Sequence, residues 1–100
     1  MAAEINRYEL SVPANRDLGE IYDYTEFEYG RQQAVTNLKM LEETFRVLVD
    51  RPAMGRRRNE IRDGLRSVVC QQHVIFYAVR ADRVRIVRVM PGNRDIPKHF

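Results

Sequence analysis

The stretch that decides the fold is LRSVVCQQHVIFYAVRADRVRIVRVM, residues 65–90 of a chain of 100 residues. It holds three runs rich in β-branched and apolar residues, 65–70, 74–79 and 84–90. The polar segments between them are only three and four residues long, as hairpin connections are, so the runs predict an antiparallel meander. The last two runs are too apolar for one of their faces to lie fully in water. The sheet therefore needs a covering layer.

Two helical patterns in the first half of the chain supply this layer. The first repeats at intervals of 4, 3, 4 and 4 and consists of Ala14, Leu18, Ile21, Thr25 and Tyr29. Its acidic residues are expected on the other side of the helix; they are Asp17, Glu20, Asp23 and Glu26. The second repeats at intervals of 4, 3, 4 and 3 and consists of Ala34, Leu38, Leu41, Phe45 and Leu48. The two patterns predict an antiparallel helical hairpin with a very short loop.

Residues at the ends of these patterns favour helix termini. Ser11 or Asn15 is expected to cap the first helix, with Pro13 in its first turn, where a missing N–H costs nothing. Gly30 is expected to end this helix in the left-handed αL conformation. Pro52 stops the second helix, because the residue before a proline is displaced from the helical region.

A short strand is expected at residues 8–12, where apolar and polar residues alternate, and a basic loop at residues 51–64. The resulting order, β-α-α-β-β-β, predicts an α+β fold in which an antiparallel sheet packs on an N-terminal helical hairpin. A chain of this length forms one domain, residues 1–100. The second face of the sheet is expected to be partly open, because only the C-terminal tail remains to cover it.

The composition excludes several classes of protein. No run approaches the ~18 apolar residues that a membrane span needs, and the start of the chain lacks the apolar stretch of a secretory signal. Cys70 is the only cysteine, so an intrachain disulfide is impossible and a reducing, cytoplasmic setting is expected. One cysteine and two distant histidines, His73 and His99, give no cluster of metal ligands. Neither a metal nor another cofactor is expected.

Charge is divided along the chain. Residues 1–50 hold 5 Lys/Arg against 10 Asp/Glu, a formal net charge of −5, whereas residues 51–100 hold 12 against 4, or +8. Such a division suits a different charged partner on each part of the surface. The arginines at 56–58 are not expected to bind DNA directly, because the loop has no interleaved aromatic residues and two nearby acidic residues dilute its field.

No catalytic motif is found. The chain contains neither a GxxxxGK[ST] loop, nor a GxSxG elbow, nor an HExxH pair. Cys70 lies in a strand pattern and is expected to be a small core residue, since nothing obvious lowers its pKa. Tyr77 is expected to be a packed aromatic residue of a strand, and His73 a hydrogen-bonding residue of a hairpin.

A series of short motifs runs through the chain in a fixed order. The first half carries Tyr8-x-Leu10-Ser11, Ala14-x-x-Asp17-Leu18-x-x-Ile21-x-x-Tyr24-Thr25 and Tyr29-Gly30-x-x-Gln33-Ala34. The second half carries Leu41-x-x-x-Phe45-x-x-Leu48, Arg51-Pro52-x-x-Gly55, Gly64-Leu65-Arg66, His73-x-Ile75-x-Tyr77 and Ile86-Val87-Arg88-Val89-Met90-x-Gly92-x-x-Asp95. Each motif alone is unspecific, but in series, over residues 8–100, they resemble the toxins of the ParE family.

The resemblance implies the RelE/ParE-like toxin fold and a growth-inhibiting toxin of a bacterial type II toxin–antitoxin module. It implies a hetero-oligomeric complex with a ParD-like antitoxin, which usually brings the DNA-binding domain, and inhibition of DNA gyrase without enzymatic activity. We expect the antitoxin to bury apolar residues that the two helical patterns leave over, Phe27, Val35, Val47 and Met54. The sequence departs from the family at Pro91, where the family usually has a histidine.

The C-terminal tail is expected to make the toxic contact. The strand at 84–90 holds its start, Pro91 and Gly92 turn the chain, and Pro97 limits the freedom of the last residues. An aromatic anchor among arginines and hydrogen-bonding residues is typical of an interface hot spot. The residues expected to bind the target are Arg88, Asn93, Arg94, Asp95, Lys98, His99 and Phe100. In the alternative, the apolar residues of the tail only pack back onto the sheet.

RelE-type toxins share the fold and cleave mRNA on the ribosome, and they define the alternative function. Such cleavage needs a general base, and Arg or Lys beside the phosphate. RelE-like sequences have an arginine on the middle strand and a tyrosine near the terminus, and these positions fall on Val74 and Phe100, which cannot do this chemistry. Arg66, Arg94 and His99 form a partial catalytic set, so the nuclease alternative stays open.

Overall fold

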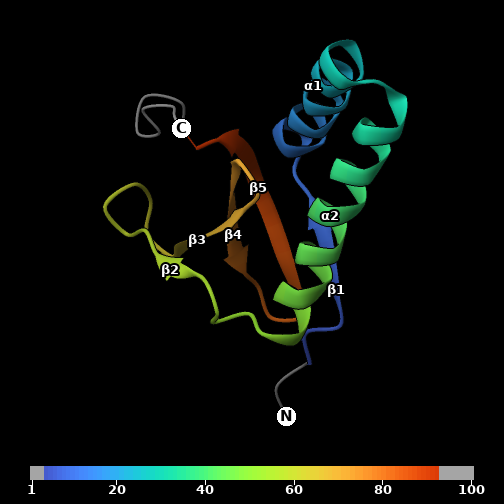
Figure 1. Ribbon diagram of the computed structural model, residues 1–100. Coiled ribbons are helices and arrows are strands. Elements are labelled where there is room, and N and C mark those ends of the chain that lie inside the picture. Colours follow the sequence, from blue (N-terminus) through green and yellow to red (C-terminus); the bar gives the residue numbers. More distant parts are fainter. Residues whose placement is uncertain (1–3, 93–100) are drawn as a thin grey trace.

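A computed structural model describes residues 4–92 of the chain. The elements follow the expected order, with one short additional strand: β1 (Arg7–Leu10), α1 (Val12–Tyr29), α2 (Arg31–Asp50), β2 (Arg56–Arg57), β3 (Leu65–Cys70), β4 (His73–Val79) and β5 (Arg83–Pro91). The two helices form an antiparallel hairpin on one face of the sheet (Figure 1). The predicted α+β fold, a sheet packed on an N-terminal helical hairpin, is confirmed.

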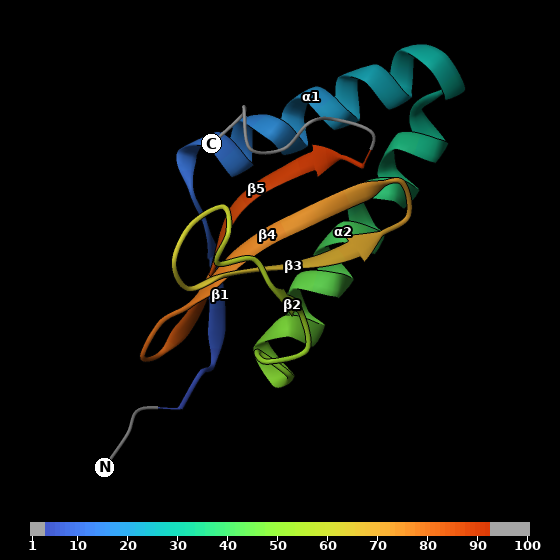
Figure 2. The same cartoon turned by 90° about the vertical axis from the view of Figure 1, so that its left-hand side faces the viewer.

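The sheet has the strand order β1-β5-β4-β3-β2 (Figure 2). Strands β2 to β5 are antiparallel to their neighbours as expected, but β1 pairs parallel with β5, so the sheet is mixed. A parallel pair needs a long crossover, and the helical hairpin begins that crossover here. Strand β2 lies inside the segment 51–64 that was expected to be a loop, and its two residues are too few to show a pattern.

The start of α1 confirms Ser11 as its N-cap. The Ser11 hydroxyl accepts a hydrogen bond from the backbone N–H of Ala14 at 3.0 Å, and Pro13 lies in the first turn. The strand expected at 8–12 therefore ends two residues earlier, at Leu10. Gly30 ends α1 with φ +92° and ψ 166°, a conformation open to glycine but not the expected αL one, because the next helix begins directly at residue 31.

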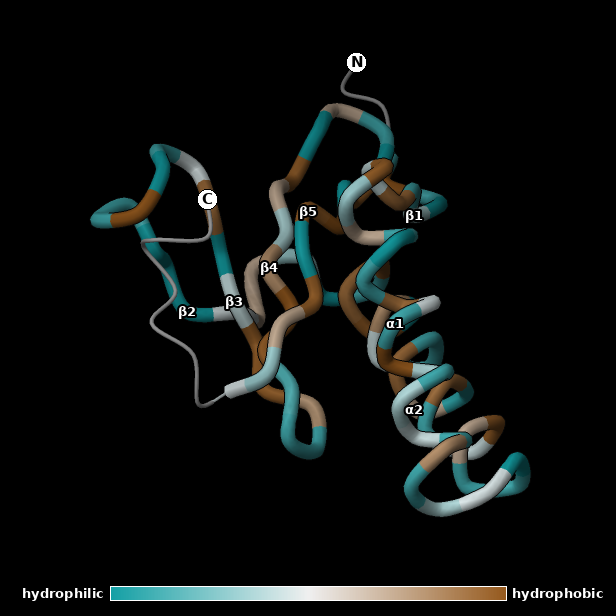
Figure 3. The backbone as a smooth tube through the Cα atoms, turned by 90° about the horizontal axis from the view of Figure 1, so that it is seen from above, coloured by the Kyte–Doolittle hydropathy of each residue, from teal (hydrophilic) through white to brown (hydrophobic). Residues whose placement is uncertain are grey.

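The main core lies between the hairpin and the sheet. Its buried residues include Leu18 of α1, Leu41, Phe45 and Leu48 of α2, and Ile75, Tyr77, Val84 and Ile86 of the sheet. Seen from above, the hairpin lies beside β1 and β5, while β2 and β3 are farthest from it (Figure 3). Two expectations for α1 are wrong. Tyr29, placed on the apolar face, is 70% exposed at the end of the helix, and Asp17, placed on the solvent side, is buried.

The opposite face of the sheet carries a second, smaller cluster. Leu65, Phe76 and Met90 are buried there, and Ile61 from the loop before β3 packs on them. Arg58 from the same loop lies 5.6 Å from the centre of the Phe76 ring, a cation–π contact. The loop thus covers part of this face.

Candidate functional site

The turn after α2 is tied to the sheet by Tyr77. Its buried hydroxyl donates to the carbonyl oxygen of Pro52 at 2.9 Å and accepts the N–H of Gly55 at 2.7 Å. Arg66 of β3 donates through Nη1 to the carbonyl oxygens of Gly55 at 2.8 Å and Ala53 at 3.3 Å. Burial raises the pKa of Tyr77, which keeps the hydroxyl protonated as a donor. These contacts join three of the sequence motifs, those that contain Pro52 and Gly55, Arg66, and Tyr77.

The same network explains the glycine at position 55. A Cβ there would lie 2.9 Å from the carbonyl oxygen of Ser67 and would collide with the Tyr77 hydroxyl. The backbone of the turn approaches β3 and β4 too closely for any side chain, so the position requires glycine for space rather than for conformation.

Asp17 and Ser11 satisfy the backbone of β5 beyond its pairing with β1. That pairing ends at Ile86, whose carbonyl oxygen accepts the N–H of Ser11 at 2.9 Å. The Ser11 hydroxyl donates to the carbonyl oxygen of Val87 at 2.7 Å, and the N–H of Val89 donates to Asp17 Oδ2 at 3.0 Å. These groups would otherwise form an unpaired sheet edge, a common site of unwanted strand pairing.

Arg88 forms a bidentate ion pair with Asp17. Its Nε lies 2.7 Å from Oδ2 and its Nη2 lies 2.9 Å from Oδ1 of the carboxylate. The hydrogen bonds to Asp17 raise the pKa of Arg88, so the guanidinium is held in its charged form. Arg88 was predicted as a target-binding residue, but its guanidinium faces α1 and holds the end of β5 in place.

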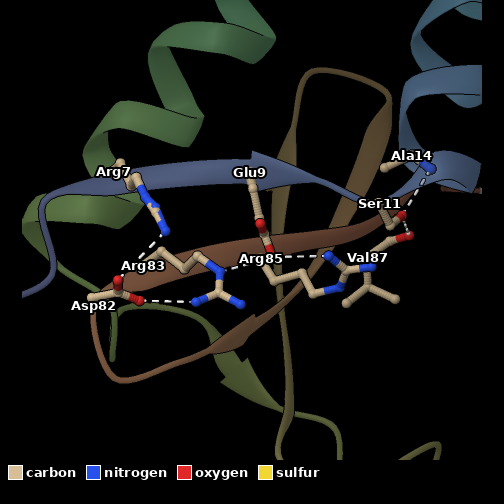
Figure 4. Close-up of polar contacts among 8 residues, drawn as sticks. All are labelled: Arg7, Glu9, Ser11, Ala14, Asp82, Arg83, Arg85 and Val87. Carbon is tan, nitrogen blue, oxygen red and sulfur yellow. Dashed lines mark hydrogen bonds and ion pairs between the residues drawn. The ribbon is translucent and has the colours of Figure 1, made fainter.

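A group of charged residues lies on the sheet face opposite the hairpin, where β1 meets β5 (Figure 4). Glu9 Oε1 lies 2.8 Å from both Arg83 Nε and Arg85 Nη1, and Arg83 Nη1 lies 2.9 Å from Asp82 Oδ1. Arg83 first and then Arg85 hold the pKa of Glu9 below its usual value. One carboxylate therefore serves two guanidinium groups at this position.

A cleft of about 350 Å³ opens beside this group on the same sheet face. Its floor consists of Leu65, Ala78 and Val87, and its walls include Arg62 and Arg80. Four arginines and one acidic residue, Asp63, line the cleft, so its lining is mainly basic above apolar side chains. The sequence contained the basic residues but gave no signal that β3, β4 and β5 bring them together, because these pairings are non-local.

The four residues predicted to bind the antitoxin are spread along the hairpin. Phe27 is 87% exposed near the Gly30 turn, whereas Val47 and Met54, 42% and 47% exposed, lie at the far end of α2 and after it. Val35 is half-buried. At 1.5 Å per residue, positions 35 and 47 lie about 18 Å apart along α2, so these residues do not form one patch. Two exposed aromatic residues were missed, Tyr24 and Tyr29, 63% and 70% exposed.

Most of the predicted target-binding and alternative catalytic residues lie outside the described part of the chain. They are Asn93, Arg94, Asp95, Lys98, His99 and Phe100. Of the alternative catalytic set only Arg66 is described, and its Nη1 donates to two backbone carbonyls, as above. Val74, which falls at the position expected for an arginine in the nuclease alternative, is half-buried against the second cluster.

The two remaining candidate residues, Cys70 and His73, lie at the ends of neighbouring strands of the sheet. Cys70 is buried, and the hydroxyl of Thr44 lies 3.3 Å from its Sγ. His73 begins β4 opposite Cys70 and Pro91, and its partial burial lowers its pKa. Within residues 4–92 no three His, Cys, Asp or Glu side chains are placed to hold a metal ion. Neither helix of this part of the chain is long and apolar enough to cross a membrane.

Comparisons with known proteins agree with this fold. The model of the family described as the ParE toxin of the type II toxin–antitoxin system parDE matches residues 8–96. Toxin ParE1 of Caulobacter vibrioides is 34% identical over 93 residues, which cover 93% of this chain and 96% of that protein. Toxin ParE1 of Mycobacterium tuberculosis is 33% identical over 96 residues, 95% of this chain and 98% of that protein.

A solved structure shares the architecture. It is described as the chromosomal ParDE TA system from P. aeruginosa and superposes with a TM-score of 0.76 at 19% identity, over 88% of this chain and 96% of the other. Fold and motifs together define a toxin of a type II toxin–antitoxin system. The chain belongs to the ParE toxin family of the parDE system.

Proposed function

We propose that this chain stops growth by binding DNA gyrase, that it does so without catalysing a reaction, and that a ParD-like antitoxin neutralises it in the cytoplasm. The observation that carries the proposal is the family match over residues 8–96. Two relatives named as toxins also match this chain over nearly their whole length. Members of one family with the same fold and length do not always share a target, so the target needs its own support.

The absence of a nuclease site among the described residues supports a binding function. Ribose 2′-OH activation needs a base, and the phosphate needs a free cation close by. Val74 offers neither, and Arg66 is committed to the turn after α2. The nuclease alternative therefore lacks the arginine expected on the middle strand. The one described residue of its catalytic set, Arg66, instead binds backbone carbonyl oxygens of the turn after α2.

The hairpin supports an antitoxin partner. Phe27, Tyr24 and Val47 are large apolar or aromatic side chains that stay in water in this chain by itself. A partly disordered antitoxin segment that folds along the hairpin would cover them, and the area buried would offset the entropy lost on ordering. Val35 and Met54 are the two further residues that we assign to this contact.

The end of β5 supports a target-binding tail. Asp17 accepts hydrogen bonds from the Arg88 side chain and from the N–H of Val89, so the end of β5 is held in a fixed position. Residues 93–100 begin three residues after Met90, which is itself 1% exposed. A short tail that starts from a fixed position loses less entropy on binding than one that starts from a mobile end.

The experiment that tests the target follows DNA and protein synthesis in cells in which the chain is induced. Labelled thymidine incorporation should fall within minutes while labelled methionine incorporation continues. Co-expression of the antitoxin encoded beside the toxin should restore thymidine incorporation. Loss of protein synthesis first, with codon-specific cuts in a mapped message, would contradict the proposal and support the nuclease alternative.

A further inference from the structure

Charge is separated between the two layers of the fold. The helices α1 and α2 together hold 8 Asp/Glu against 4 Lys/Arg, a formal net charge of −4. Residues 51–92, which form β2 to β5 and their loops, hold 3 Asp/Glu against 10 Lys/Arg, or +7. The hairpin covers one face of the sheet (Figure 1), and the arginines of the cleft lie on the opposite face. The molecule therefore has a negative pole at the hairpin and a positive pole away from it.

A row of neighbouring residues crosses the sheet on this face. Leu65 of β3 pairs with Ala78 of β4, which pairs with Arg85 of β5. Arg85 in turn pairs with Glu9 of β1. At the other end of the row, the N–H of Arg58, directly after β2, donates to the carbonyl oxygen of Leu65 at 2.8 Å. Neighbouring strands lie about 4.8 Å apart, so the backbones of Arg58 and Arg85 lie roughly 14 Å apart, with an apolar floor between them.

One arginine of the cleft is available to a ligand. Arg58 pairs with Glu60 at 2.8 Å, so acidic residues do dilute the field of the loop, as expected. The side chain of Arg80 is exposed at the cleft, and within the described part of the chain it forms no hydrogen bond or ion pair. Its N–H donates to the carbonyl oxygen of Arg83 at 2.8 Å, which continues the pairing of β4 with β5. Because side chains alternate along a strand, Arg80 lies on the same face as Ala78.

Charge density distinguishes the polyanions as ligands of this face. A duplex carries one negative charge per about 1.7 Å of its axis, hence about eight charges over the roughly 14 Å between Arg58 and Arg85. A single strand or an extended acidic peptide carries about half that density, one charge per roughly 3.4 Å. Single strands gain affinity by stacking on aromatic rings, and among the described residues no aromatic side chain lines the cleft.

We propose that the sheet face opposite the hairpin binds the phosphate backbone of duplex DNA without sequence preference. The arginines at 56–58 were not expected to bind DNA by themselves, and β4 and β5 add Arg80 and Arg85 to them on one face. Phosphate contacts position a protein but carry no sequence information. The negative charge of the hairpin turns it away from the phosphates, so the charge separation orients the chain on the duplex. The proposal rests on the proposed function only for its setting, in which the DNA is the segment that gyrase holds.

The test measures binding of the full chain to a short fluorescein-labelled duplex by fluorescence anisotropy over a range of salt concentrations. Arg80→Gln removes one charge from the face, and Lys39→Gln, the matched control, removes one charge from an exposed position of α2. Each phosphate contact contributes about −0.9 to the slope of log K against log[salt], so the slope for Arg80→Gln should be less steep by about 1, with roughly tenfold weaker binding at low salt. Lys39→Gln should match the parent in slope and affinity. Both variants should keep the melting temperature of the parent, because both residues are exposed.

Further arms decide the class of ligand. Duplexes of two unrelated sequences should bind with equal affinity, whereas a single-stranded oligothymidylate and a polyglutamate of matched length should bind more weakly. Tighter binding of either competitor, equal slopes for the two variants, or no duplex binding at low salt would overturn the proposal. Gyrase inhibition is measured in a separate assay. A chain that inhibits gyrase without binding a free duplex overturns this inference alone, and one that binds the duplex but spares gyrase overturns only the proposed function.

Discussion

Asp17 and Arg88 lie 71 residues apart in the sequence and form a bidentate ion pair that joins α1 to β5. The Asp17 side chain is 9% exposed and that of Arg88 24%, and the carboxylate also accepts the N–H of Val89. One carboxylate thereby fixes both the side chain and the backbone at the end of the last strand. Residues 93–100, to which we assign the target contact, follow this point in the sequence.

Removing this carboxylate should destabilise the protein. Asp17→Ala leaves a partly buried guanidinium and the N–H of Val89 without their acceptor, at a cost of about 3 kcal/mol. For a domain of this size that corresponds to a fall in melting temperature on the order of 10 °C or more. A double-mutant cycle with Arg88→Leu, measured by chemical denaturation, should give a coupling free energy above ~1 kcal/mol. Additive effects of the two substitutions would show that the pair is not a structural link.

The turn after α2 should depend on the Tyr77 hydroxyl and on the space at Gly55. Tyr77→Phe leaves the carbonyl of Pro52 and the N–H of Gly55 unsatisfied, for a loss of about 1–3 kcal/mol. Gly55→Ala should cost as much or more, because its Cβ would collide with the Tyr77 hydroxyl. The double variant should recover little of the Gly55→Ala loss, since the ring carbon Cε1 at 2.7 Å and the carbonyl oxygen of Ser67 at 2.9 Å would still collide with the new Cβ. Urea unfolding of the three variants measures this, and a Gly55→Ala variant as stable as the parent would contradict the packing argument.

The stability of the fold should fall as the pH is lowered through the range in which His73 titrates. Burial lowers its pKa below the ordinary 6.5, so between that lowered value and 6.5 the unfolded chain binds more protons than the folded one. The free energy of unfolding therefore decreases as pH falls from about 7 through this window. His73→Gln should show a flatter pH dependence in thermal melts. A His73 that titrates at or above 6.5 by NMR would refute the assignment.

Much of the fold could be predicted from the sequence, because its signals are local. Strand β3 has the predicted bounds, Leu65–Cys70, and α2 ends before Pro52 as predicted, since periodicity and terminal residues act within a few positions. The parallel pairing of β1 with β5 could not be predicted, because no pattern in either strand encodes its partner. The burial of Asp17 was missed for the same reason. Its position in the helical pattern is ambiguous, and its partners lie on β5.

Less of the candidate site could be predicted. The exposed Phe27 was identified as left over from the helical seam, but Tyr24 was not assigned to a binding surface and Tyr29 was placed on the apolar face of the helix, although both are more exposed than Val47. The arginines of the cleft were counted as part of a basic half, without their arrangement. Sheet pairing brings Leu65, Ala78 and Arg85 into one row, and that row is visible only in three dimensions.

The antitoxin surface should be sensitive to its exposed aromatic residues. Phe27→Ala removes an 87% exposed ring, so it should leave the melting temperature nearly unchanged and should weaken antitoxin binding by about 2 kcal/mol, some thirtyfold. Glu28→Ala, a neighbouring exposed position, is the matched control and should bind as the parent does. Calorimetry with the purified antitoxin checks both. Parent-like binding of Phe27→Ala would move the antitoxin contact away from this end of the hairpin.

The central claim is most directly tested by a supercoiling assay with purified DNA gyrase, relaxed plasmid and two forms of the chain, the full protein and a form that ends at Asn93. The full protein should inhibit supercoiling in proportion to its concentration, and prior mixing with the antitoxin should abolish the inhibition. The shortened form should fold and bind the antitoxin but leave gyrase active, because the hairpin is intact and the tail is gone. Unimpaired supercoiling with the full protein, or equal inhibition by both forms, would contradict the account.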